Sequence, residues 1–226
     1  MSRQIEAVLF DMDETLLDRQ ASLRAFVRAQ HARHAHVLGS VDVEHFVERF
    51  LTLDDNGRLW KDEVYRRILD ENDITDLDAQ TLVDEYLADF NRHCIGFPDL
   101  RPMLDALQPL GLRLGVITNG RYPFQQRNFE ALSVADFFDI VVVSGAEQIR
   151  KPDPEIFHRA LGRIGASPKS TVFVGDNPDA DIRGAQNVGM RGVWKRNFYW
   201  PTCPHADAVI DNLRDLPPLL HTWQNG

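Results

Sequence analysis

The sequence has few cysteines, no excess of positive charge and no long apolar run, and each of these shortages excludes a class of protein. Cys94 and Cys203 are the only cysteines among 226 residues, too few for a disulfide framework or a four-cysteine zinc site. Lys and Arg number 25 against 34 Asp and Glu, and a net charge of −9 argues against nucleic acid or an anionic membrane as a partner. The first apolar run, residues 5–10, is too short for a signal peptide or a membrane span. We therefore expect a cytoplasmic protein with reduced thiols.

The composition that remains is that of a folded protein. Hydrophobic residues make up 43% of the chain and charged residues 26%, close to the globular average. The length of 226 residues fits one large domain, or one domain that carries a smaller insertion.

Short apolar runs alternate with helical patterns over most of the chain, which predicts an α/β fold with a doubly wound parallel sheet. The predicted strands are 5–10, 112–118, 138–144, 171–176, 191–194 and 207–210. Three predicted helices between them are 123–132, 154–164 and 178–188. Several of the strand runs are apolar on both faces, as strands between two helix layers must be.

Residues 18–94 interrupt this alternation. Their apolar residues recur three and four positions apart, which is typical of amphipathic helices. We predict a core domain formed by residues 1–17 and 95–226, and an inserted α-helical domain at 18–94.

Polar residues follow four of the predicted strands. Ligands of open parallel sheets bind beyond the carboxyl ends of the strands, so these residues are expected to share one site. They are Asp11, Asp13, Thr118, Lys151, Asp176 and Asp181. Several carboxylates at one place repel each other, and hard oxygen ligands without His or Cys favour Mg²⁺. The sequence therefore predicts a Mg²⁺ site among these carboxylates.

The same residues can perform phosphoryl transfer. Of Asp11 and Asp13, one could attack phosphorus as a nucleophile, while the other could protonate the leaving oxygen and later activate water. Thr118, the backbone amides of Asn119 and Gly120, and the Lys151 ammonium could bind the phosphate. Asp11, Asp13 and Lys151 are the predicted catalytic residues, and hydrolysis follows where water is the acceptor.

The segments DMDETLLD, the strand end at Thr118, Lys151-Pro152 and GDNPDAD resemble, in order, the four motifs of the haloacid dehalogenase superfamily of phosphatases. The resemblance covers the whole chain. It implies that Asp11 is the nucleophile, Asp13 the general acid and base, and Thr118 the phosphate-binding hydroxyl. It also implies that Asp176 binds Mg²⁺ together with Asp11 and the backbone carbonyl of Asp13. Asp181 is then expected to support the metal or its water shell. The helical insertion at 18–94 is similar to the mobile cap of that superfamily.

Glu14 departs from the family pattern, because many relatives have Gly after the second Asp. This weakens any inference about the substrate more than the inference about the reaction. The expected partner is a small phosphorylated metabolite, such as a sugar phosphate or a nucleotide.

Three alternatives to a phosphatase remain at this stage. A phosphomutase of the same superfamily would use the same motifs. A 2-haloacid dehalogenase would release halide without metal, although that branch lacks an Asp at position 13. A noncatalytic binding protein would keep the fold without turnover.

Overall fold

The computed structural model describes residues 4–225, and the chain divides into two compact units, each of which is described by itself. The core unit comprises residues 1–18 and 96–226, and the helical unit comprises residues 19–95. Both junctions lie one residue later than the boundaries predicted from the sequence.

The core unit is built on a six-stranded sheet in the order β3-β2-β1-β4-β5-β6. All five strand pairs are parallel. The strands are β1 Ala7–Phe10, β2 Arg113–Thr118, β3 Ile140–Val143, β4 Thr171–Gly175, β5 Arg191–Lys195 and β6 Ala208–Ile210. Every residue of β1 and β4 is buried, which explains why these runs are apolar at successive positions. The predicted α/β class and parallel sheet are confirmed.

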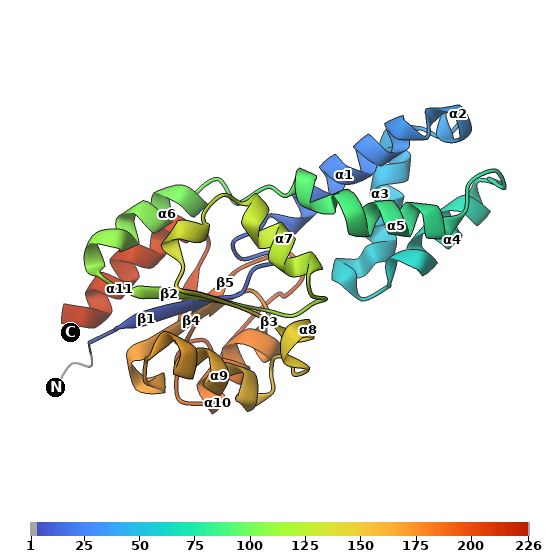
Figure 1. Ribbon diagram of the computed structural model, residues 1–226. Coiled ribbons are helices and arrows are strands. Elements are labelled where there is room, and N and C mark those ends of the chain that lie inside the picture. Colours follow the sequence, from blue (N-terminus) through green and yellow to red (C-terminus); the bar gives the residue numbers. More distant parts are fainter. Residues whose placement is uncertain (1–3, 226) are drawn as a thin grey trace. The chain divides into compact units, whose positions relative to one another are not determined.

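Helices cover both faces of this sheet (Figure 1). They are α6 Leu100–Leu107, α7 Phe124–Ala131, α8 Ser144–Glu147, α9 Pro154–Ile164, α10 Gly184–Asn187 and α11 Leu216–Asn225. The helices α9 and α10 lie on one face, and α6 and α11 lie on the other. The helix α9 begins with the Asp153 side chain as N-cap and ends at Gly165, and its apolar side, including Phe157, packs against Phe173 of β4.

The segment predicted as one helix at 178–188 has two parts. Pro178–Arg183 forms a π-helical turn, and α10 follows directly. The side chain of Asn177 caps the turn by accepting hydrogen bonds from the amides of Asp179 and Ala180 at 3.0 and 2.9 Å. The turn fixes the position of Asp181 relative to the end of β4.

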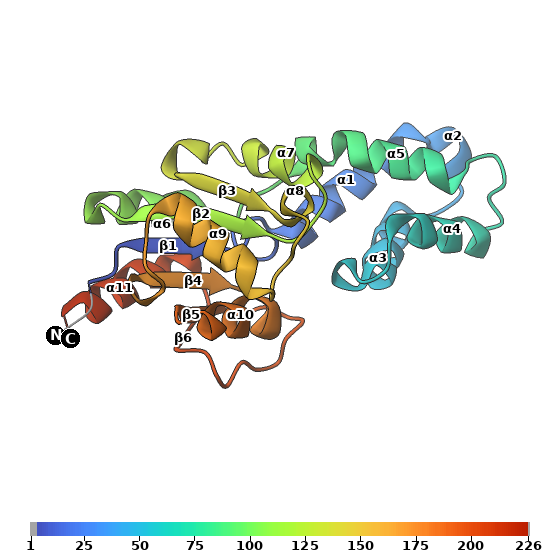
Figure 2. The ribbon, with the colours of Figure 1, turned by 60° about the horizontal axis from the view of Figure 1, so that its bottom comes forward.

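The helical unit contains α1 Arg19–Arg33, α2 Ala35–Leu38, α3 Val43–Asp54, α4 Lys61–Glu71 and α5 Ala79–Asp89. Aromatic side chains form much of its interior, including Phe26, Phe50 and Tyr65. Figure 2 shows the same helices from a second direction. Over residues 4–225, no helix combines the length and the apolar character needed to cross a membrane.

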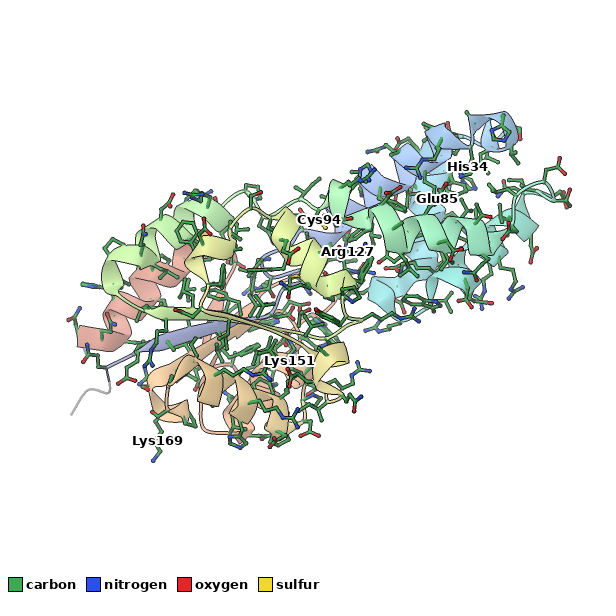
Figure 3. The ribbon with its side chains drawn as sticks, viewed as in Figure 1. His34, Glu85, Cys94, Arg127, Lys151 and Lys169 are labelled. Carbon is green, nitrogen blue, oxygen red and sulfur yellow. The ribbon has the colours of Figure 1, made fainter. Side chains whose placement is uncertain are left out.

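Charged groups also lie inside the helical unit. The carboxylate of Asp54 accepts hydrogen bonds from Arg19 at 2.7 and 3.1 Å and from the ammonium of Lys61. We call these three residues the Asp54 cluster. Separately, His34 contacts Glu85 across the unit at 3.0 Å (Figure 3).

Candidate active site

The register of the sheet brings the ends of three strands together. Phe10, the last residue of β1, is paired with Val116 of β2 on one side and with Val174 of β4 on the other. Asp11 continues the pairing, since its amide donates to the Val174 carbonyl at 2.8 Å. The residues that follow β1, β2 and β4 therefore share one edge of the sheet.

Three carboxylates and one ammonium meet at this edge. Oxygens of Asp11, Asp176 and Asp181 all lie within 4.8 Å of one another. The Lys151 ammonium lies 2.6 Å from Asp11 Oδ1 and 2.7 Å from Asp181 Oδ1. Figure 3 places Lys151 within the core unit, beside the sheet. We call these four residues the Asp11 cluster; the structure thus brings together residues that the sequence spreads over 171 positions.

The Asp11 cluster has more negative than positive groups, and its pKa values reflect this. Burial raises the pKa of Asp11 to about 7, with Asp181 and Asp13 adding to the effect against the opposing pull of Lys151. Burial, followed by repulsion from Asp181, Asp11 and Glu14, raises the pKa of Asp176 well above its ordinary value. The pKa of Lys151 is raised despite its burial, because Asp11 and Asp181 stabilise the ammonium. A divalent cation would relieve the repulsion.

The donor set fits Mg²⁺, which prefers carboxylate oxygens and keeps several waters. Asp11 and Asp176 are the residues best placed to hold it. Both oxygens of Asp181 already have partners, since Oδ1 faces Lys151 and Oδ2 accepts from the Asn177 amide at 2.9 Å. Asp181 is therefore better suited to orienting Lys151 and the metal's surroundings than to direct ligation.

Hydrogen bonds hold Asn119 and Gly120, which follow β2, to Lys151 and Ser144. The side chain of Asn119 forms two hydrogen bonds with the backbone of Lys151, at 3.0 and 2.9 Å. The amide of Gly120 donates to Ser144 Oγ at 2.9 Å. Asn119 and Gly120 thus hold the site together in this structure, and their contact with a phosphate stays a prediction. Thr118 is buried at the end of β2, beside this segment.

Asp13 has a partner that sequence reasoning missed. Gln125, on α7, donates from Nε2 to Asp13 Oδ2 at 2.6 Å. Its side chain is only 4% exposed. The sequence feature that could have indicated its role is its place at the start of the predicted helix that follows Thr118.

Asn197 is a second residue that the sequence did not reveal. Its side-chain amide donates to Asp176 Oδ2, and its Oδ1 accepts from the amides of Tyr199 and Trp200 at 3.0 and 3.2 Å. It lies just beyond β5, the strand next to β4, so its place at the strand ends was the only clue. Asn197 orients the carboxylate of Asp176.

Glu14 takes a conformation that glycine adopts more easily. Its φ is +58°, and its carbonyl accepts a hydrogen bond from Lys195 Nζ at 3.0 Å. Lys195 is buried, with its ammonium 3.5 Å from the centre of the Phe97 ring, and burial lowers its pKa. This bond holds the turn after Asp13 in place.

Comparison with known proteins places this site in a family. The sequence model of the haloacid dehalogenase-like hydrolases matches residues 5–189. The chain belongs to that family. The resemblance seen in the four motifs is therefore confirmed at the level of the family.

Relatives within the haloacid dehalogenase-like hydrolases include several named phosphatases. The chain is 31% identical over 159 residues to a phosphoserine phosphatase of Thermus thermophilus, a match that covers 70% of this chain and 64% of that one. It is 30% identical over 238 positions to a phosphoglycolate phosphatase of Salmonella typhi, covering 96% and 93%. The chain spans between 41% and 64% of the first four curated relatives that it matches.

Solved structures of the family include both phosphatases and dehalogenases. A phosphatase of Thermococcus onnurineus is 29% identical with a TM-score of 0.66, over 96% of this chain and 98% of that one. A 2-haloacid dehalogenase of Pseudomonas syringae pv. Tomato is 34% identical with a TM-score of 0.64, over 97% and 100%. Similarity alone does not separate these two activities.

Proposed function

We propose that this protein is a magnesium-dependent phosphatase that hydrolyses a small-molecule phosphate monoester through an aspartyl-phosphate on Asp11. The observation that carries the proposal is the convergence of the carboxylates of Asp11, Asp176 and Asp181, with the Lys151 ammonium bonded to the first and the last of them. Asp13, which is half-buried, follows Asp11 by two residues. Mg²⁺ dependence, the covalent intermediate and a cytoplasmic location are parts of this proposal.

In the first step, a carboxylate oxygen of Asp11 attacks phosphorus and the bond from phosphorus to the leaving oxygen breaks. Asp13 gives its proton to that oxygen, so an alcohol leaves rather than an alkoxide. In this proposal the hydroxyl of Thr118 and the amide of Asn119 donate hydrogen bonds to the phosphate oxygens.

In the second step, water attacks the phosphorus of the aspartyl-phosphate and gives its proton to Asp13. Inorganic phosphate leaves and Asp11 is free again. Lys151 favours the ionised form of Asp11 before the attack and stabilises negative charge on the phosphoryl group in both steps. A bound Mg²⁺ would supply further positive charge at the phosphoryl oxygens.

A dehalogenase is the strongest alternative, because a structure titled as one is 34% identical over nearly the whole chain. Halide leaves as an anion and needs no proton. A carboxyl group at position 13, hydrogen-bonded by a buried glutamine, therefore favours a leaving group that takes a proton. A phosphomutase would transfer the phosphoryl group to a second hydroxyl instead of water.

The test is a screen of phosphorylated metabolites and p-nitrophenyl phosphate with wild type and Asp11→Asn. The variant keeps the shape of the side chain but loses the attacking charge, so we expect turnover to fall by at least about 10⁴-fold while the melting temperature shows an intact fold. Wild-type rates in Asp11→Asn would remove Asp11 from the role of nucleophile.

Three further measurements separate the alternatives. Removal of Mg²⁺ with EDTA should abolish phosphate release, and metal should restore it. Halide release from 2-chloropropionate in EDTA would instead establish a dehalogenase. Recovery of an isomeric phosphate ester rather than inorganic phosphate would establish a mutase.

A further inference from the structure

We infer that Gln125 is a positioning residue for Asp13: it holds Oδ2 of that carboxyl as a hydrogen-bond acceptor, so that Oδ1 exchanges the proton with the leaving group. This inference rests on the proposed function and extends it to a residue outside the four motifs.

The orientation of the Gln125 amide follows from its neighbours. Nε2 lies 3.3 Å from the backbone carbonyl of Asn119, which can only accept a hydrogen bond. On the other side, Oε1 of Gln125 accepts from Nδ2 of Asn128 at 3.0 Å. With the amide reversed, its oxygen would face the Asn119 carbonyl, and two acceptors would oppose each other. Nε2 therefore points toward Asp13.

This orientation has a consequence for the proton on Asp13. The Nε2 hydrogen points at Oδ2 across 2.6 Å, and an amide N–H can only donate. A proton on Oδ2 would meet that hydrogen, so the acid form of Asp13 carries its proton on Oδ1. One carboxylate oxygen is thus fixed in place and the other is assigned to proton transfer.

The residues around the Gln125 amide leave room for it and bond it to the phosphate-binding segment. A side chain at Gly120 would begin 2.6 Å from Gln125 Cγ and 3.0 Å from Nε2, so glycine there makes room for the amide. Nε2 also lies 3.2 Å from Thr118 Oγ1, the hydroxyl proposed to bind phosphate. A single buried amide thereby links the proton donor to the phosphate-binding residue.

A change of Gln125→Met keeps the length of the side chain but removes all the hydrogen bonds of its amide. We expect the loss in kcat/KM to depend on the leaving group, since an acidic phenol leaves without a proton and a weakly acidic one does not. The loss should be about 3-fold or less for p-nitrophenyl phosphate and about 10- to 100-fold for phenyl phosphate. The measurement is the slope of log kcat/KM against leaving-group pKa over substituted phenyl phosphates, which steepens in the variant. Because kcat/KM covers only events up to phosphorylation of Asp11, hydrolysis of the intermediate does not affect it.

Gln126→Met is the matched control, because Gln126 is the next residue on α7 and bonds Glu130 at 3.0 Å instead. It should keep the wild-type slope. Asn128→Ala leaves Gln125 in place but removes the donor to Oε1, so it should steepen the slope less than Gln125→Met does. It also serves as the test if Gln125→Met does not fold.

Two outcomes would overturn the inference while leaving the proposed function intact. One is an equal loss for all leaving groups in Gln125→Met, as expected if the amide acted only through Thr118 or through packing. The other is a wild-type slope in both Gln125→Met and Asn128→Ala. If wild type itself released no phosphate from any ester, the proposed function would fail and this inference with it.

Discussion

Two clusters of buried charge, one in each unit, have opposite compositions. The Asp11 cluster sets three carboxylates against one ammonium, whereas the Asp54 cluster sets one carboxylate against a guanidinium and an ammonium. Lys151 and Lys61 are equally buried, at 2% exposed. Burial alone therefore does not distinguish a reactive site from a structural one.

The pKa values show the difference. Burial raises the pKa of Asp11 to about 7, because one ammonium does not offset desolvation and two nearby acids. Burial also opposes ionisation of Asp54, but Arg19 and Lys61 outweigh it and lower the pKa of that carboxyl. An added cation would therefore reduce the repulsion in the Asp11 cluster, whereas the charge of Asp54 is already compensated by Arg19 and Lys61.

The largest effect on stability is expected from Asp54→Asn. The change leaves two buried cations without their carboxylate, which lowers the free energy of unfolding by about 3–5 kcal/mol. Chemical denaturation at pH 7 measures it. Because the pKa of Asp54 is lowered by folding, its contribution is present above the unfolded pKa and is lost as pH falls through the folded pKa. The gap between wild type and variant should therefore close below about pH 4.

Asp55→Asn is the control for that experiment. Asp55 is the neighbouring residue, and its ion pair with Arg58 at 3.1 Å is exposed at the surface. Such a pair contributes about 0–1 kcal/mol, so the variant should unfold nearly as wild type does. Equal losses from Asp54→Asn and Asp55→Asn would contradict the structural role given to the Asp54 cluster.

Lys151→Met tests the Asp11 cluster in the same way, by removing its cation. Without the ammonium, the negative charge that develops on the phosphoryl group is no longer stabilised by Lys151. We therefore expect kcat/KM for p-nitrophenyl phosphate to fall about 10²- to 10³-fold. Lys169→Met, an exposed lysine of the core unit that projects away from it (Figure 3), should leave the rate unchanged. A Lys151→Met enzyme within about 3-fold of wild type would show that Lys151 only supports the fold.

Much of the fold could be predicted because buried parallel strands carry an unmistakable apolar pattern. The six strands lie where the pattern placed them, within two residues at each end. The helices α6 and α11 were not predicted; each has proline in its first turn, at Pro102 or at Pro217 and Pro218. Proline is tolerated there because the first amides of a helix have no carbonyl partner within it.

The site was predictable where polar residues follow a strand directly or belong to one of the four motifs. Asp11 and Asp176 stand at the ends of β1 and β4, so strand order brings them together. Gln125 and Asn197 are single polar residues in a helix and a loop, and nothing in the sequence marks them as part of the site. The Asp54 cluster was hidden for the same reason, because its charges resemble the solvated charges around them.

The smallest predicted effect concerns the acids of the Asp11 cluster in protein freed of divalent cations. Folding raises the pKa of Asp11 to about 7 and that of Asp176 as well, so between about pH 4 and pH 7 the folded state binds more protons than the unfolded state. Stability from this cluster is therefore full below the unfolded pKa and is lost as pH rises through the folded pKa. Asp176→Asn removes one acid, so without metal the variant should become more stable than wild type by about 1 kcal/mol above pH 7, or roughly 2–4 °C in melting temperature.

Addition of Mg²⁺ should reverse this order. The melting temperature of wild type should rise with the metal, as a ligand of the folded state requires, whereas that of Asp176→Asn should hardly change. Asp179→Asn changes an exposed acid of the π-helical turn that follows Asp176, paired with Arg183 at 3.4 Å, and should follow wild type in both conditions. A difference in melting temperature between Asp176→Asn and wild type that stays constant from pH 5 to pH 8 in EDTA would show that repulsion among the acids does not destabilise the fold. The contrast with the Asp54 cluster would then not support a cation site at the Asp11 cluster.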